Sequence, residues 1–487
     1  MTVADRRHVT GNAGSIASSL DALLMTARDR GGPAPLICTT LPAAPLDPID
    51  LFAAARALGL EAALLLQPTA DRSITGIGRA WAIESGGPDR FSVATATWRA
   101  VVAGALRSGE SAERPENGPM LVGGLGFNGQ RPAADDPWAS FAPASLVLPA
   151  FGMTRSEEGT SLTVAVGPDQ VVGLDTDCVE QMWDSLARDA TARGATPDAP
   201  ELEPEPGLLR VIDERPDRAG WDRTVGLFAG AVGRGRIDKV VLARRVVFRA
   251  DADLDVVAAL RHLARTAPES TTFAFVRNGS TFLGATPERL VRTVGRSFET
   301  VAIAGSAPRG RDAEDDARFA AAMLASEKER EEHAVVVDML RTSLAPIAEV
   351  LQVAEAPAIL PLRHVQHLAT RVTGTLRDEE GLLALAERLH PTPAVGGAPR
   401  DVALALITAH EGFDRGWYAG PIGWLGADGD GELMVALRCG LIDGSQATLF
   451  AGCGIVADSD PGREWEESRL KLRTMIAALG RVEEDIE

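Results

Sequence analysis

The sequence lacks any apolar run long enough to cross a lipid bilayer, which takes about 20 residues. Its start, MTVADRRHVTGNAGS, has no apolar stretch after the arginines and therefore does not look like a secretory signal. The four cysteines are widely spaced, which argues against a disulfide framework or a zinc site and indicates buried thiols in a reducing compartment. We therefore expect a cytoplasmic protein with no membrane partner.

Positive charge is also scarce. The chain has 49 Lys and Arg against 68 Asp and Glu, which gives a net charge of −19. This balance argues against a surface for nucleic acid or for an anionic membrane. If the ligand is an anion, the protein must gather cations or a metal ion in one pocket against its own field.

With 487 residues the chain can bury a large core, and length alone suggests roughly two to four domains. Residues 1–30 predict an N-terminal extension, partly disordered or helical. Residues 186–216 are rich in Ala, Pro, Asp and Glu, which predicts a surface connection. This connection separates an N-terminal part, 31–185, from a denser part, 217–480.

Both parts mix strand patterns with separate helical patterns. DKVVLARRVVF predicts a buried strand, and Asn278-Gly279 predicts a hairpin turn. Residues 312–348 predict a long helical region, and residues 416–456 predict a meander of antiparallel strands. Its GADGDGE segment has the wrong spacing for a calcium loop and predicts a turn. The pattern indicates an α+β fold and not alternating βαβ units.

A stretch near the end of the chain, REWEESRLKL, places three charged residues on one helical face. Glu464, Glu467 and Lys471 fall at i, i+3 and i+7. The simplest interpretation is a solvated ion pair, which contributes a few tenths of a kcal/mol. The functional interpretation adds Glu332, which precedes an apolar helical run, to make a metal site. Carboxylates with few histidines nearby favour Mg²⁺.

Three other charged residues adjoin or interrupt apolar strand patterns. Lys239 heads a strand, where it is either a snorkelling surface residue or a desolvated base with a lowered pKa. Glu288 follows a proline turn and is either a turn acid or a proton donor. Arg438 lies inside an apolar strand pattern and needs an anion there. The glycine segments AIAGSAPRG and FAGCGIV are either turns or backbone cradles for a carboxylate.

Taken together, these segments resemble the chorismate-utilising enzymes, and among them the isochorismate synthases. The resemblance runs through residues 216–480 and is weaker over 30–180. It implies a single α+β domain, 31–487, with two large antiparallel β-sheets packed together, helices outside and the active site in a cleft between them. It is carried, in this order, by DKVVLARRV, FLGATPERLV, AIAGSAPRG, SEKEREEHAVVVD, HLATRVTGTL, LHPTPAVGGAPRD, GWYAGPIGW, LRCG and FAGCGIVADSDPGREWEESRLKL.

The resemblance also implies an activity, the reversible isomerisation of chorismate to isochorismate. Water adds at C2 and the C4 hydroxyl leaves, with Mg²⁺ and no other cofactor. Lys239 matches the base that activates water, and Glu288 matches the acid that protonates the leaving hydroxyl. The remaining matches are Glu332, Glu464 and Glu467 for the metal, and Gly305, Ser306, His367, Ala394, Arg438, Gly452 and Lys471 for the substrate.

Relatives with other activities share this scaffold, so the fold alone does not choose among them. Anthranilate-forming relatives use ammonia and normally lack the lysine base. Aminodeoxychorismate-forming relatives often carry a lysine where this chain has Ala304. Salicylate synthases keep the base and the acid but tend to have Thr in place of Ala394, so they are the alternative. We expect no glutaminase subunit and a monomer, and the intact Lys239 and Glu288 argue against an inactive binding subunit. Whether the product serves menaquinone, siderophore or salicylate synthesis stays open.

Overall fold

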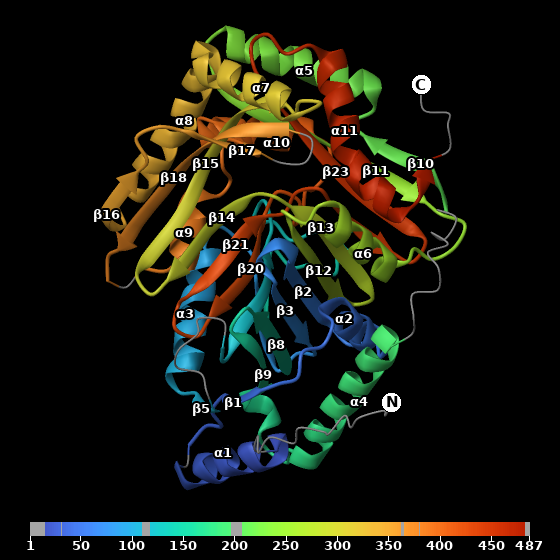
Figure 1. Cartoon of the computed structure of the whole chain (residues 1–487), viewed down its shortest axis with the longest axis vertical. Helices are drawn as coiled ribbons and strands as arrows, with labels where there is room; N and C mark the ends of the chain where they lie inside the picture. The colour runs from blue at the N-terminus through green and yellow to red at the C-terminus, as the bar shows by residue number, and fades with distance from the viewer. Residues whose placement is uncertain are drawn as a thin grey trace, which may run out of the picture.

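The computed structural model describes residues 15–30, 32–109, 117–195, 207–361, 365–378 and 380–482. Its secondary structure mixes helices and strands along the whole chain (Figure 1). The helices are α1 (Ile16–Arg30), α2 (Pro48–Ala57), α3 (Arg90–Ala103), α4 (Thr176–Ala195), α5 (Arg218–Gly233), α6 (Val256–Thr266), α7 (Ala313–Ala325), α8 (Glu327–Leu344), α9 (Leu382–Leu389), α10 (Arg400–His410) and α11 (Pro461–Leu479).

Two sheets contain the strands. The large sheet has the order β24 (Arg481–Val482), β10 (Leu208–Arg215), β11 (Lys239–Arg249), β23 (Gln446–Ile455), β22 (Cys439–Asp443), β13 (Ser280–Thr286), β12 (Thr271–Arg277), β2 (Ala62–Gln67), β3 (Arg72–Ile77), β8 (Phe151–Ser156), β9 (Gly159–Val166), β1 (Ile37–Pro42) and β5 (Leu106–Gly109), with β19 (Gly397–Ala398) beside β11. The small sheet has the order β16 (Ala348–Val353), β18 (Val365–Leu376), β15 (Ser297–Pro308), β14 (Arg289–Val294), β21 (Gly431–Val435), β20 (Pro421–Gly426), β6 (Met120–Leu125), β7 (Ala144–Leu148) and β4 (Trp81–Ser85), with β17 (Ala358–Pro361) beside β18.

Strands from before residue 186 pair with strands from after residue 216 in both sheets. In the large sheet β2 pairs with β12, and in the small sheet β6 pairs with β20. All described pairs except β1 with β5 and β10 with β24 are antiparallel. The two sheets therefore both depend on residues before 186 and after 216.

The alternation of side chains along the strands fills two separate layers of core. On β12, Phe273 and Phe275 belong to the cluster that joins the two sheets, whereas Ala274 and Val276 belong to the cluster under the outer helices. This is the period of two that a strand buried on both faces requires. Each fully buried phenylalanine contributes about 1.5–3 kcal/mol relative to an exposed one.

Helices cover the outer faces of both sheets (Figure 1). Helices α6 and α11 contact the large sheet at β12, β13 and β23, and α8 and α9 contact the small sheet at β14 and β15. The α+β fold with two large, mostly antiparallel sheets and helices outside is thus confirmed. No helix within the described residues is long and apolar enough to cross a membrane.

The structure describes two expected turns and parts of the two segments expected to lie outside the core. The hairpin turn is confirmed, because Asn278 and Gly279 have φ of 48° and 86° between β12 and β13. In the 1–30 extension, α1 is helical, and residues 1–14 lie outside the described part. In the expected connection 186–216, α4 continues to Ala195 and β10 begins at Leu208, so secondary structure occupies both of its ends. The GADGDGE segment is the turn between β20 and β21.

Candidate active site

Lys239 is the first residue of β11, between β19 and β23. Its backbone pairs with Ala398 on β19. Its side chain lies against Gly454 on β23, where an added Cβ would come within 2.4 Å of Lys239 Cε and 3.0 Å of Nζ. The glycine therefore leaves the space that the lysine side chain occupies. The snorkelling interpretation of this lysine does not fit such a position.

The surroundings of Lys239 favour the neutral amine. Burial lowers the pKa of Lys239 because it removes the ammonium group from water. The carboxylates of Glu332, Glu467 and Glu288 oppose this shift, while the charge of Lys471 adds to it. The same interactions bring together five residues that the sequence had marked separately.

Glu288 has the opposite shift. It lies between β13 and β14, and its backbone is fixed because Glu288 N donates to Thr286 Oγ1 (3.3 Å) and its carbonyl accepts from Val435 N (2.9 Å). Burial raises the pKa of Glu288 to about 7, although the charges of Lys239 and Lys471 lower it. A protonated carboxyl group is therefore well populated near neutral pH, as a proton donor requires.

Helix α11 brings its charged face to β23. The helix begins where the Asp460 side chain accepts from Arg463 N (2.9 Å). Lys471 Nζ lies 2.6 Å from a Glu467 carboxylate oxygen, which is the i,i+4 pair expected of a simple surface. It also donates to the carbonyl of Gly452 (2.8 Å), so the pair is docked on the strand. Glu464 on the same helix accepts from Ser459 Oγ (2.8 Å).

Three potential metal ligands converge at this face. The ligand atoms of Cys453, Glu464 and Glu467 all lie within 4.8 Å of one another. Burial raises the pKa of Cys453 to about 12, so its sulfur stays a thiol and donates to the Glu464 backbone carbonyl (3.2 Å). Burial and the charge of Glu467 raise the pKa of Glu464, because both disfavour its charged form. A bound cation would favour that charged form. Oxygen donors of this kind suit Mg²⁺.

Glu332 stands apart from that group. It is exposed on α8 and is not among the three residues whose ligand atoms lie within 4.8 Å. Its carboxylate nevertheless opposes the lowering of the Lys239 pKa more strongly than any other charge does. Its role as a third metal ligand stays a prediction.

The position of Arg438 differs from the one expected from the sequence. It does not lie inside a strand but between β21 and β22, with φ of 49°. At this point the chain leaves the small sheet and enters the large one, so the predicted meander is split between the two sheets. Burial lowers the pKa of Arg438, and the acidic groups of Tyr418 and Glu467 oppose this shift. The side chain is therefore a desolvated cation near the α11 carboxylates.

His367 and Gly305 meet where β18 pairs with β15. The ring Nδ1 of His367 donates to the Gly305 carbonyl (2.9 Å), and Ser306 is opposite His367 in the strand register. Burial lowers the pKa of His367, the hydrogen bond to the Gly305 carbonyl opposes this shift, and the charges of Arg438 and Lys471 add to it. These influences place His367 and Gly305 with the cluster around Lys239. The side chain of Ser306 lies outside the described part.

Ala394 belongs to the segment that runs from the end of α9 through β19, which we call the 390–398 loop. The loop is fixed to β11 by hydrogen bonds from Asp238 N to Ala398 O (2.8 Å) and from Val241 N to Gly396 O (2.9 Å). Ala394 is partly buried between these anchors and the end of α9. The loop and the strand that carries Lys239 therefore form one rigid unit.

A buried ion pair that local sequence patterns do not reveal fixes this unit. Arg415 donates to the carbonyls of Val395 (2.7 Å) and Val241 (2.8 Å), and its Nε donates to Glu411 (2.8 Å). Glu411 in turn accepts from Ala243 N (2.8 Å). Both side chains are 2% exposed. In the sequence, EGFDR looks like polar surface, so only its i,i+4 charge spacing could have suggested the pair.

Comparison with known proteins agrees with this geometry. A family described as chorismate binding enzyme matches residues 22–480. The chain belongs to the chorismate binding enzymes. The salicylate biosynthesis isochorismate synthase of Pseudomonas aeruginosa is 37% identical over 92% of this chain and 90% of its own length. The isochorismate synthase MenF of Bacillus subtilis is 35% identical over 76% of this chain and 77% of its own length.

Solved structures show the same architecture in this family. The menaquinone-specific isochorismate synthase MenF of Escherichia coli matches with a TM-score of 0.73 and 25% identity, covering 95% of this chain and 100% of the other. Anthranilate synthase component I of Streptococcus pneumoniae matches with a TM-score of 0.67 and 23% identity, covering 83% of this chain and 92% of the other. The second likeness concerns the fold only, since different activities share it.

Proposed function

We propose that this member of the chorismate binding enzymes converts chorismate reversibly to isochorismate, with Mg²⁺, by adding water at C2 and expelling the C4 hydroxyl. The observation that carries the proposal is the meeting of Lys239 and Glu288, with their pKa values shifted in opposite directions, beside the carboxylates of α11. Isochorismate synthases that are more than a third identical to most of the chain support it.

The two shifts divide the proton transfers between the two residues. Neutral Lys239 takes a proton from water as the new C2–O bond forms. Protonated Glu288 gives its proton to the C4 oxygen, which leaves as water. In the reverse reaction each residue has the opposite role, and each begins in the protonation state that the forward reaction left. Separated pKa values of this kind are how one site supplies both an acid and a base near neutral pH.

The described carboxylates fit a magnesium ion. Glu464 and Glu467 would hold it, and Glu332 is the third ligand we propose. When bound, the ion supplies positive charge for a substrate carboxylate. Lys471, held by Glu467 and the Gly452 carbonyl, adds a fixed cation at the same place. An acidic protein needs such a concentration of positive charge to bind a dianion.

The remaining residues orient the substrate. Arg438 would hold the second carboxylate, because a desolvated guanidinium forms strong paired hydrogen bonds with that group. The backbone at Gly305, Ser306 and Gly452 is the remaining part of the proposed carboxylate site. His367 and Ala394 would line the ring pocket. Because water and not ammonia is the nucleophile, we propose that no glutaminase subunit is needed.

Salicylate formation is the alternative. It needs the same base and acid and then eliminates pyruvate from isochorismate. The name of the Pseudomonas relative joins salicylate biosynthesis to an isochorismate synthase, so it favours isochorismate as the product of that protein. Incubation with chorismate and Mg²⁺, followed by chromatography, tests the proposal. We expect a chorismate–isochorismate mixture that the Lys239→Ala variant does not form. Stoichiometric release of pyruvate and salicylate would instead establish the alternative.

A further inference from the structure

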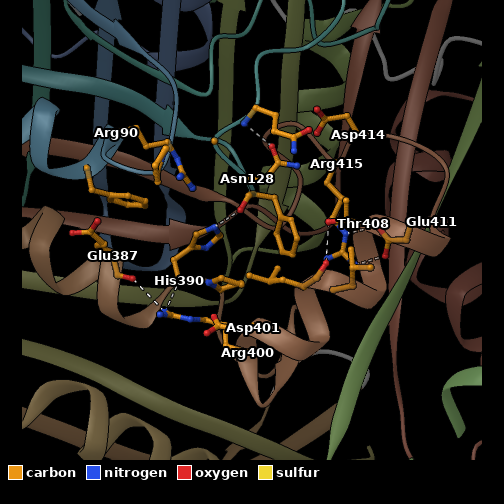
Figure 2. A pocket seen from close by; sticks show the side chains of 18 of the residues that line it. Arg90, Asn128, Glu387, His390, Arg400, Asp401, Thr408, Glu411, Asp414 and Arg415 are labelled. Atoms are coloured by element: carbon orange, nitrogen blue, oxygen red, sulfur yellow. Dashed lines mark hydrogen bonds and ion pairs between the residues drawn. The ribbon is translucent and has the colours of Figure 1, made fainter. Parts of the chain in front are cut away.

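A cleft opens beside the 390–398 loop, between α3, α9, α10 and the turn that follows β6 (Figure 2). Its volume of about 560 Å³ is in the range of pockets that hold small molecules. Among the described residues that line it, none is a predicted catalytic, metal or substrate residue of the first site. In Figure 2, Arg90 and Glu387 lie on one side, Asp414 and Arg415 on the other, and His390 between them.

Arg90 is a buried cation with no ion pair in the described part of the chain, although the charge of Glu387 partly offsets the lowering of its pKa by burial. It is 7% exposed, and its guanidinium donates to the carbonyls of Gly126 (3.0 Å) and Gly87 (3.4 Å). Its Nε has no hydrogen-bond partner. Figure 2 shows the guanidinium directed toward the middle of the cleft. A desolvated cation that lacks a paired charge is costly, and an anionic ligand group would remove that cost.

The other walls restrict what such a ligand can be. Phe127, Leu404 and Phe413 supply apolar surface that suits a ring. Glu387 and Asp401 also line the cleft and would repel further negative charge. Arg400 lines it too, but its guanidinium donates to the carbonyls of Arg388 (3.2 Å) and His390 (3.1 Å). The lining therefore favours one carboxylate opposite Arg90 and disfavours a dicarboxylate such as the substrate of the first site.

The cleft also touches the residues that fix the catalytic strand. Arg415 and Glu411 line it, and they hold the backbone of Val241, Ala243 and Val395. His390, at the start of the 390–398 loop, lines it as well and bonds to the Phe127 carbonyl (3.0 Å). A molecule in the cleft would contact the groups that set the position of β11 and hence of its first residue, the proposed base.

We propose that this cleft is a regulatory site for a small monocarboxylic acid with an apolar ring, and that its occupancy is coupled to chorismate binding. The coupling rests on the proposed function, but the binding site does not. Coupling must be reciprocal, because each ligand changes the affinity of the other by the same factor.

Benzoate is the probe, with binding followed by calorimetry and by saturation-transfer NMR. We expect saturable binding of benzoate, weaker binding of phthalate, and none of benzylamine. Arg90→Gln should weaken benzoate binding at least tenfold, whereas Arg90→Lys, which keeps the charge, should restore most of it. Arg438→Gln, in the first site, should leave benzoate binding unchanged. If Arg438→Gln abolishes binding and Arg90→Gln does not, benzoate occupies the first site and the proposal is wrong.

A second pair of variants tests the same cleft without replacing the buried Arg90, whose substitution can misfold the protein. Thr408 is exposed on the wall of the cleft, so Thr408→Trp should fill the space without disturbing the core. Val402, exposed on the same helix but outside the cleft lining, provides the control Val402→Trp. Benzoate binding should be lost in the first variant and kept in the second. Equal binding by both would overturn the assigned site.

The coupling has its own measurement. Benzoate affinity should change by at least threefold when chorismate and Mg²⁺ saturate the Lys239→Ala variant, in which turnover is expected to be blocked. The apparent affinity for chorismate should change by the same factor when benzoate saturates. Benzoate binding that depends on Arg90 but ignores chorismate would remove the regulatory role and leave only the site. If the enzyme has an activity other than isochorismate formation, the proposed function is wrong, but the benzoate binding site is unaffected.

Discussion

Replacing Gly454 with Ala displaces the proposed base without removing it. The new Cβ would lie 2.4 Å from Lys239 Cε, whereas carbon atoms in contact are about 3.5 Å apart, so the side chain must move by about 1 Å. The atoms it meets are the far end of a flexible side chain, and Gly454 is not among the glycines with positive φ. We therefore expect the sheet to accept the alanine.

The cost should fall on catalysis and not on stability. A displacement of about 1 Å at a reacting group can cost about 100-fold in rate, which corresponds to about 2.7 kcal/mol in the activation free energy. The displaced amine also gains contact with water, so the pKa of Lys239 should rise. The acid limb of the pH profile should then move to higher pH, because the neutral amine is the active form.

The assay is the initial rate of isochorismate formation across a range of pH, with the melting temperature measured by calorimetry. Gly152→Ala on β8 is the matched control, since an added Cβ there meets nothing closer than 3.9 Å. It should leave both rate and stability unchanged. A Gly454→Ala enzyme with the wild-type rate and melting temperature would refute the view that this glycine places the base. An equal loss of stability in both variants would show a general effect of the added methyl group.

Three further variants test the charges around the site. Glu467→Gln removes a proposed metal ligand, so the Mg²⁺ concentration for half-maximal activity should rise about tenfold, and an unchanged titration would mean that α11 presents only a surface. Lys471→Gln removes a cation that lowers the pKa of both Lys239 and Glu288, so both limbs of the pH profile should move to higher pH, and a shift to lower pH would contradict this account. Glu288→Gln should lower kcat/KM by about 10²–10⁴ and abolish the fall in activity that its deprotonation causes above a pH of about 7. A surviving limb near pH 7 would assign that proton to another group.

Features encoded by short-range patterns could be predicted from the sequence. The apolar run after Lys239 indicated a buried strand, and Asn278-Gly279 indicated a turn because both positions tolerate positive φ. The spacing of Glu464, Glu467 and Lys471 placed them on one helical face. Such patterns depend only on residues within a few positions of one another.

Features that depend on distant pairing could not be predicted from local patterns. The pairing of β2 with β12 joins segments about 200 residues apart, and nothing within either strand specifies the partner. Arg438 looked like a strand residue because apolar residues flank it on both sides, yet the chain changes sheets there. The sequence gives no sign that the Glu411–Arg415 pair is buried, because burial of charged residues shows only once the fold encloses them.

The most direct test of the central claim is to follow the oxygen atom. Chorismate incubated with Mg²⁺ in ¹⁸O-labelled water should give isochorismate with the label at the C2 hydroxyl, and the Lys239→Ala variant should incorporate almost none. Isochorismate that carries no label, or equal labelling by the variant, would contradict the proposal that Lys239 deprotonates the attacking water.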